Sequence, residues 1–307
     1  MLDRQRSLRQ TVPLSVLAAM AIALVTQHAA AALPVANSEY VALGDSWTAG
    51  AALVGSQWSV SDQFVPLGCA QSDNNYPKLV ARALRVAEFR DASCAGARIA
   101  NLPNRQAVPF GDANPPQLDR LSRATDLVTV GIGGNDAGLG EAVRNCITVQ
   151  PPALHAHSCK LEYTAGGVDR ITANIPATEA AVVAVVEEIR RRARDADIFL
   201  VNYLAGLVEP GCWPTVQVAD DDMIWIAQKL REINAMLARA AHAAGAHLVD
   251  TYTSSAGHDV CQPPNVRYIE GWIPFSQNGP ALVVPIHPNA AGAMFQARTV
   301  LAAIGQY

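Results

Sequence analysis

Apolar and polar residues alternate along the chain in two different patterns. Short, mainly apolar runs, each ending near a polar or glycine residue, have the length of strands buried on both faces. They lie at 39–44, 87–92, 126–132, 197–203 and 246–250. Longer segments with apolar residues at helical spacing lie between and after them, at 76–86, 178–193, 220–244 and 287–304. Strands that alternate with helices predict an α/β fold, with a mainly parallel sheet between two layers of helices.

The remaining stretches are richer in Pro, Gly, Asn and Cys, and they are expected to be long connecting loops of one domain. They cover 51–75, 101–120, 137–175, 205–219 and 251–286. Loops of this length commonly serve to bind a substrate. In open parallel sheets ligands bind at the carboxyl ends of the strands. Unusual residues that follow a predicted strand therefore become the candidates for function.

Composition supports a single large core and excludes one class of partner. The 307 residues are 50% hydrophobic and 16% charged, with a formal net charge of −4. Nucleic-acid-binding proteins usually carry a basic patch or stripe, and none is visible here. We therefore expect no nucleic-acid partner.

The N-terminus has the three-part pattern of a secretory signal peptide. Three arginines within the first ten residues precede an apolar stretch at about 12–25, and small residues follow at 29–32. The apolar stretch is short for a membrane span, which needs about 20 residues. We expect a signal peptide over 1–32, cleavage near Ala32, and a secreted protein with one domain over 33–307. The alternative is an uncleaved N-terminal anchor.

Six cysteines follow the leader, at 69, 94, 146, 159, 212 and 261. An even count in an exported protein predicts three disulfides. No pair has the close C-x-x-C spacing of structural zinc sites, so we expect no metal. Six cysteines allow many pairings and the sequence alone selects none, although sequential pairing closes the smallest loops.

Two glycine-containing turns come directly after predicted strands. Gly44-Asp45-Ser46 places a serine where a strand turns into a helix, so that its amide can point into a site. A helix N-cap is the simpler explanation of this serine alone. Gly133-Gly134-Asn135-Asp136 follows the strand at 126–132, and its asparagine amide can donate to an oxyanion. Taken alone, it is equally well a tight turn.

Two further segments complete the set of candidates. His287 lies between prolines near the end of the chain and can act as a general base at neutral pH. Gly96 lies in the turn 93–97, where its amide can complete an oxyanion hole, although a plain turn held by a disulfide explains it as well. Each signal is weak alone, but together and in this order they are informative.

In these blocks the chain resembles the SGNH (GDSL-type) hydrolase family, above all its secreted actinobacterial esterases and lipases with three disulfides. The resemblance spans residues 44–289 and implies a flavodoxin-like three-layer α/β/α fold. It implies Ser46 as nucleophile, His287 as base, and an oxyanion hole formed by Ser46, Gly96 and Asn135. It also implies sequential disulfides, which are Cys69–Cys94, Cys146–Cys159 and Cys212–Cys261.

One position departs from the family. Most members carry an aspartate three residues before the histidine, where this chain has Val284. The group that orients the imidazole must come from elsewhere. We expect the main-chain carbonyl of Val284 to accept the histidine Nδ1–H, as in related esterases that work with a Ser-His dyad. A distant carboxylate such as Asp259 is the alternative.

The resemblance implies a carboxylic ester hydrolase that forms an acyl-enzyme and needs no cofactor. Lipid or acyl esters are the expected substrates, with transient contact to lipid surfaces and a monomeric state. An acetylesterase acting on polysaccharide or cell-wall acetyl groups is one alternative. A non-catalytic binding protein on the same fold is another, because fold alone does not guarantee activity.

Overall fold

The structure is a computed structural model that describes residues 39–54, 63–147, 158–272 and 282–305. All of these belong to the compact unit Pro34–Tyr307. The predicted signal peptide or anchor at 1–32 lies outside the described residues.

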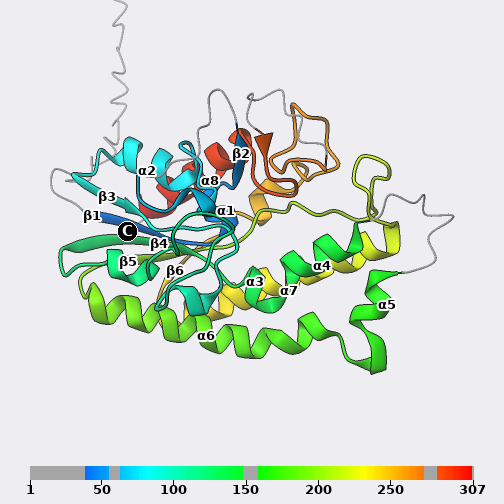
Figure 1. Cartoon of the computed structure of the whole chain (residues 1–307), viewed down its shortest axis with the longest axis horizontal. Helices are drawn as coiled ribbons and strands as arrows, with labels where there is room; N and C mark the ends of the chain where they lie inside the picture. Colours follow the sequence, from blue (N-terminus) through cyan, green and yellow to red (C-terminus); the bar gives the residue numbers. More distant parts are fainter. Residues whose placement is uncertain (1–38, 55–62, 148–157, 273–281, 306–307) are drawn as a thin grey trace, which may run out of the picture. The chain divides into compact units, whose positions relative to one another are not determined.

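Five parallel strands form the central sheet (Figure 1). They are β1 (Glu39–Gly44), β3 (Glu88–Asp91), β4 (Thr125–Gly131), β5 (Asp197–Val201) and β6 (His247–Val249). Their spatial order is β3-β1-β4-β5-β6, the order of a flavodoxin-like sheet. In such a sheet the connections reverse direction between β1 and β4, and the carboxyl ends of those two strands flank a crevice. All five strands were predicted from the apolar runs.

Helices cover both faces of this sheet. α6 (Arg170–Arg192) and α7 (Asp220–Ala244) lie on one face, and α2 (Tyr76–Leu84) and α8 (Ala290–Ile304) lie on the other (Figure 1). Alternate side chains of a strand point to opposite faces. Accordingly, Val41 and Leu43 of β1 belong to the core formed with α6 and α7, whereas Tyr40 and Ala42 belong to the core formed with α2 and α8. The predicted α/β/α layering is confirmed.

Two of the predicted helices begin at other residues than expected, for local reasons. α6 begins at Arg170 rather than at 178, because the Asp169 carboxylate caps the amides of Ile171 and Thr172. α8 begins at Ala290 rather than at 287, because the Asn289 side chain accepts from the Gly292 amide. His287 therefore lies before the helix and not within it.

Further short elements lie in the regions expected to be loops and in the glycine-containing turns that follow β1 and β4. They are α1 (Ser46–Ala49), β2 (Ala52–Val54), α3 (Gly134–Ala137), α4 (Leu139–Cys146), α5 (Cys159–Tyr163) and β7 (Leu282–Val283). β2 and β7 pair antiparallel in a separate ribbon. Short 3-10 segments lie at Leu67–Cys69, Ile99–Asn101, Gln117–Arg120, Ala165–Gly167 and Thr253–Ser255. The connecting loops at 51–75, 101–120, 137–175 and 251–286 therefore contain short helices and strands that were not predicted, whereas a helix after Gly44-Asp45-Ser46 was expected.

The cysteines pair sequentially, as the resemblance implied: Cys69–Cys94, Cys146–Cys159 and Cys212–Cys261. None of the helices in the described ranges has the length and apolar character needed to cross a membrane.

Candidate active site

Ser46 begins the one-turn helix α1 immediately after β1. The Asp45 carboxylate caps this helix by accepting the Trp47 amide at 2.9 Å. Gly44 has φ 154°, and a Cβ there would collide with the Thr48 side chain and lie 2.6 Å from a β4 carbonyl. This tight approach of α1 to the sheet leaves Ser46 half-buried at the carboxyl edge of the sheet. Its amide is one of the unpaired donors of a helix N-terminus.

His287 meets Ser46 from the segment between β7 and α8. Its Nε2 lies 2.8 Å from the Ser46 Oγ, although the two residues are 241 positions apart in the sequence. Two backbone hydrogen bonds hold the segment: the Glu270 amide donates to the His287 carbonyl at 2.8 Å, and the Ile286 amide donates to the Glu270 carbonyl at 2.9 Å. A serine hydroxyl hydrogen-bonded to an imidazole nitrogen is the arrangement that activates a serine nucleophile.

The other imidazole nitrogen, Nδ1, lies 2.9 Å from the carbonyl oxygen of Pro285. The expected acceptor, the Val284 carbonyl, also interacts with the imidazole, so the Pro285 carbonyl joins it as a second backbone partner. Ile286 has φ 62°, a left-handed conformation that is rare for a β-branched residue and that no sequence pattern predicts. The turn at Ile286 lets the Pro285 carbonyl face the imidazole two residues further on. The carboxylate of Asp259, the alternative partner, instead accepts from the Cys261 amide and the Gln262 side chain.

The surroundings of His287 favour its neutral form. Burial lowers its pKa below the ordinary 6.5, the carbonyls of Pro285 and Val284 raise it, and the positive charge of Arg144 lowers it further. The net pKa is below the ordinary value, so the imidazole is mainly unprotonated at neutral pH and is available as a base.

Asn135 lies in α3, which begins directly after β4 and the left-handed Gly133, with φ 112°. The Asn135 Nδ2 donates to the Ala97 carbonyl at 2.9 Å, which fixes the amide and leaves its second N–H for another acceptor. Both carboxylate oxygens of Asp136 accept from the Ile99 amide at 3.1 Å. The two side chains therefore tie the end of β4 to the loop that contains Gly96.

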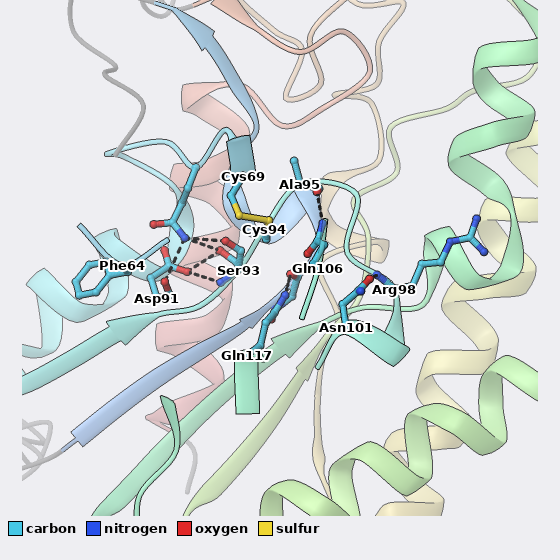
Figure 2. Close-up of a disulfide and its surroundings, with 12 residues drawn as sticks. Phe64, Cys69, Asp91, Ser93, Cys94, Ala95, Arg98, Asn101, Gln106 and Gln117 are labelled. Atoms are coloured by element: carbon cyan, nitrogen blue, oxygen red, sulfur yellow. Dashed lines mark hydrogen bonds between the residues drawn. A yellow bond between two sulfur atoms is a disulfide. The ribbon is translucent and has the colours of Figure 1, made fainter. Parts of the chain in front are cut away.

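The loop with Gly96 is also held from its other side. Figure 2 shows the disulfide Cys69–Cys94 next to Ala95, whose carbonyl accepts from Gln106 Nε2 at 2.7 Å. Gly96 itself is exposed and has φ 75°, a conformation that glycine adopts without strain. A disulfide, Gln106 and Asn135 together fix the turn in which the Gly96 amide lies.

Ser46, Gly96, Asn135 and His287, all named from the sequence, line one cavity of about 420 Å³. Most of its other walls are apolar: Leu139, Val143, Ile147, Leu207, Leu230, Trp272, Val284 and Ile286. Across the described ranges, no group of His, Cys, Asp and Glu is arranged to hold a metal ion. The site thus combines a serine–histidine pair with an apolar chamber.

Tyr203 is a site residue that the sequence reasoning missed. Its hydroxyl donates to the Asp45 carboxylate at 2.6 Å and accepts from the Gly134 amide at 2.8 Å. Burial raises the pKa of Asp45 to about 6, although the hydrogen bonds from Tyr203 and the Trp47 amide oppose this. Tyr203 was hidden because it was assigned to the predicted strand 197–203. Its position just after β5 is the same signal that identified Ser46 and Asn135.

Comparisons with known proteins agree with this geometry. The profile of the GDSL-like lipase/acylhydrolase family matches residues 42–294. The chain belongs to this family. As a member it is a carboxylic ester hydrolase, and the resemblance to the SGNH hydrolases is confirmed.

The relatives of this esterase include several Streptomyces proteins. It is 32% identical to Lipase 2 of Streptomyces coelicolor, over 97% of this chain and 98% of the relative. It is 30% identical to a lipase of Streptomyces rimosus, over 78% of this chain and 80% of the relative. The crystal structure of an extracellular Streptomyces rimosus lipase superposes with a TM-score of 0.67 at 25% identity, over 87% of this chain and 99% of that chain.

Proposed function

We propose that this enzyme is a secreted serine esterase that hydrolyses lipid or other acyl esters through an acyl-enzyme intermediate. The observation that carries the proposal is the distance of 2.8 Å between Ser46 Oγ and His287 Nε2 at an apolar cavity.

The reaction follows from this pair. Ser46 Oγ attacks the ester carbonyl while its proton passes to His287 Nε2. The alcohol then leaves with that proton, and Ser46 keeps the acyl group. A water molecule, deprotonated by His287, attacks the acyl-enzyme and releases the acid. The Pro285 carbonyl accepts from Nδ1 and so holds the ring in the tautomer whose Nε2 receives the proton.

We assign three donors to the oxyanion that forms in both steps. They are the amides of Ser46 and Gly96 and the free N–H of the Asn135 side chain. All three residues line the same cavity. Donors fixed before the reaction are effective because they do not have to reorganise as charge develops. The hydrogen bond from Asn135 to Ala97 supports this role for the amide.

The cavity favours an acyl chain over an acetyl group. Its walls are mainly apolar, and their contact with methylene groups contributes about 0.8 kcal/mol for each group buried. Relatives named lipases fit this preference. An acetylesterase would need only a small part of about 420 Å³. A non-catalytic binding protein would not need a hydrogen-bonded Ser46 and His287.

Secretion is part of the proposal. The pattern of residues 1–32 is typical of a signal peptide, the disulfides suit an oxidising compartment, and a solved relative is named an extracellular lipase. Transient contact with a lipid surface and a monomeric state are also proposed. Trp272, at the cavity with 38% of its surface exposed, is suited to meet such a surface.

The test is hydrolysis of nitrophenyl acetate, octanoate and palmitate by the purified protein and by Ser46→Ala. We expect activity that is lost in Ser46→Ala, with kcat/KM higher for octanoate than for acetate. A nitrophenyl phosphonate should label the wild-type protein once, at Ser46, as mass spectrometry of peptides would show.

The exposed Ser254 serves as a matched control, and Ser254→Ala should behave like the wild-type protein. Activity that persists in Ser46→Ala would exclude the serine mechanism. A clear preference for acetate would favour the acetylesterase.

A further inference from the structure

The helix α4 presents two rows of residues to the acyl cavity. Leu139, Val143 and Ile147 form an apolar row that continues just past the end of the helix. Gly140 and Arg144 form a second row. Residues four apart lie on the same face of a helix, so Arg144 is presented to the cavity together with the apolar wall.

Gly140 leaves room for the Arg144 side chain next to Asn135. A Cβ at Gly140 would lie 2.9 Å from the Asn135 Oδ1 and 3.7 Å from the Arg144 Nη1. The guanidinium and the Asn135 amide thus both lie close to the position that a larger residue at 140 would fill. Arg144 is therefore adjacent to the proposed oxyanion hole.

Among the described residues that line the cavity, none is a counter-ion for the positive charge of Arg144. Within the described ranges the guanidinium makes no ion pair or hydrogen bond, and the side chain is exposed. The carboxylate of Asp45 is the one other group among the described lining residues that is mainly charged at neutral pH. It is only 2% exposed and is already bound by the Tyr203 hydroxyl and the Trp47 amide.

An unpaired guanidinium beside a reactive ester site selects for anionic substrates. Its planar fork can bind a phosphate or a carboxylate with two parallel hydrogen bonds. The anion must belong to the alcohol part of the ester. In the function proposed above, the acyl chain packs against the apolar wall of α4, which leaves a charged group near solvent, where Arg144 is exposed.

We propose that Arg144 makes this enzyme selective for acyl esters of anionic alcohols, by binding a phosphate or carboxylate carried by the leaving group. The proposal rests on the esterase function proposed above and adds the chemistry of the alcohol. Arg144 acts here as a specificity-determining residue and not as a participant in proton transfer.

The experiment compares esters that share the acyl chain and the scissile bond. The probes are monohexanoylglycerol, its terminal phosphate monoester, and hexanoyl glyceric acid, all below their micelle concentrations at low salt. We expect wild-type kcat/KM to be at least about tenfold higher for one or both anionic esters, the factor that a single charge-assisted hydrogen bond provides. The preferred probe shows whether phosphate or carboxylate is the natural group.

The ratio of anionic to neutral kcat/KM is the readout for variants, because it cancels any effect common to both esters. In Arg144→Met the ratio should fall close to one, in Arg144→Lys it should be partly retained, and added salt should lower it in the wild-type protein. The control is Arg123→Met, which removes an exposed arginine that does not line the cavity and should keep the wild-type ratio.

Two outcomes would overturn the proposal and leave the esterase function intact. One is a wild-type protein that hydrolyses the neutral ester but shows no preference for either anion. The other is an anionic preference that is unchanged in Arg144→Met. If the wild-type protein hydrolysed none of the three esters and no nitrophenyl ester, the proposed function itself would fail.

Discussion

The hydroxyl of Tyr203 lies 2.6 Å from the carboxylate of Asp45, the residue before the proposed nucleophile. The same hydroxyl accepts from the amide of Gly134, the residue before Asn135. One side chain that follows β5 therefore joins the turns that follow β1 and β4. These are the strands between which the sheet connections reverse, so Tyr203 bridges the crevice at its base.

We predict that Tyr203→Phe reduces kcat more than it changes KM. The substitution leaves a buried carboxylate oxygen and a buried amide without a partner, which should cost about 1–3 kcal/mol of unfolding free energy. The placement of Ser46 and Asn135 should loosen with it. Steady-state kinetics and urea denaturation would measure both effects.

Tyr163→Phe is the matched control, because the Tyr163 hydroxyl accepts from Asn145 and does not line the cavity. It should lower stability without lowering kcat. Equal losses of kcat in the two variants would contradict a positioning role for Tyr203.

Asp45 should make stability depend on pH in an unusual direction. Its pKa is raised from the ordinary 3.8 to about 6 by burial, so the folded protein holds this proton more tightly than the unfolded chain. The contribution of protonated Asp45 to the stability of the folded protein is complete below about pH 4 and is lost as the pH rises through about 6.

Asp45→Asn keeps a helix cap and removes the charge. The unfolding free energy of the variant minus that of the wild-type protein should therefore be about 3 kcal/mol larger at pH 8 than at pH 4, since one pKa unit corresponds to roughly 1.4 kcal/mol. Denaturation curves at both pH values would show this difference. A wild-type-to-variant difference that does not change with pH would contradict it.

The pH dependence of activity should report His287. Because its pKa is below 6.5, kcat/KM for a neutral ester should fall as the pH drops through a midpoint below 6.5, where the imidazole becomes protonated. Asp45 titrates in the same range, so the measurement should be repeated in Asp45→Asn. Retention of the acidic limb in that variant assigns it to His287, whereas its loss would assign it to Asp45.

The oxyanion hole predicts a selective effect at Asn135. Asn135→Ala should lower kcat by about 100- to 1,000-fold with little change in KM, because the donor acts mainly on the transition state. The exposed Asn104, which donates to the Ala100 carbonyl in the neighbouring loop, provides the control in Asn104→Ala. If Asn135→Ala lowered kcat by less than about threefold, Asn135 would not be a donor of the oxyanion hole.

Much of the fold could be predicted from the sequence because burial on both faces leaves a simple pattern. Strands such as β1 are nearly continuous apolar runs. α7 was predicted with its observed bounds, since its periodic pattern ends at Gly245, which adopts a left-handed conformation with φ 64°. The short helices α3 to α5 escaped because they are too brief for a periodic signal and lie among glycines and cysteines.

Site residues could be predicted where a side chain suited to catalysis closely follows a predicted strand, as at Ser46 and Asn135. They could not be predicted where a single backbone angle determines which groups meet. The left-handed conformation of Ile286 brings the Pro285 carbonyl to the imidazole in addition to that of Val284, and a β-branched residue gives no warning of it. Arg144 also escaped, because the helix α4 that presents it to the cavity lay in a region expected to be a loop.

The disulfide Cys69–Cys94 should support catalysis as well as stability. It fixes the loop before Gly96, whereas the residues next to Cys212 and Cys261 in the sequence do not line the cavity. Replacing either pair by alanine should lower the unfolding free energy by about 3–4 kcal/mol, with the larger loss for Cys212–Cys261, since it closes the longer loop. The loss of kcat should have the opposite order, because only the first pair holds a proposed oxyanion donor.

Kinetics at a temperature where both variants are folded, as circular dichroism would verify, would separate the two effects. A loss of kcat that simply follows the loss of stability would mean that Cys69–Cys94 does not position the Gly96 amide.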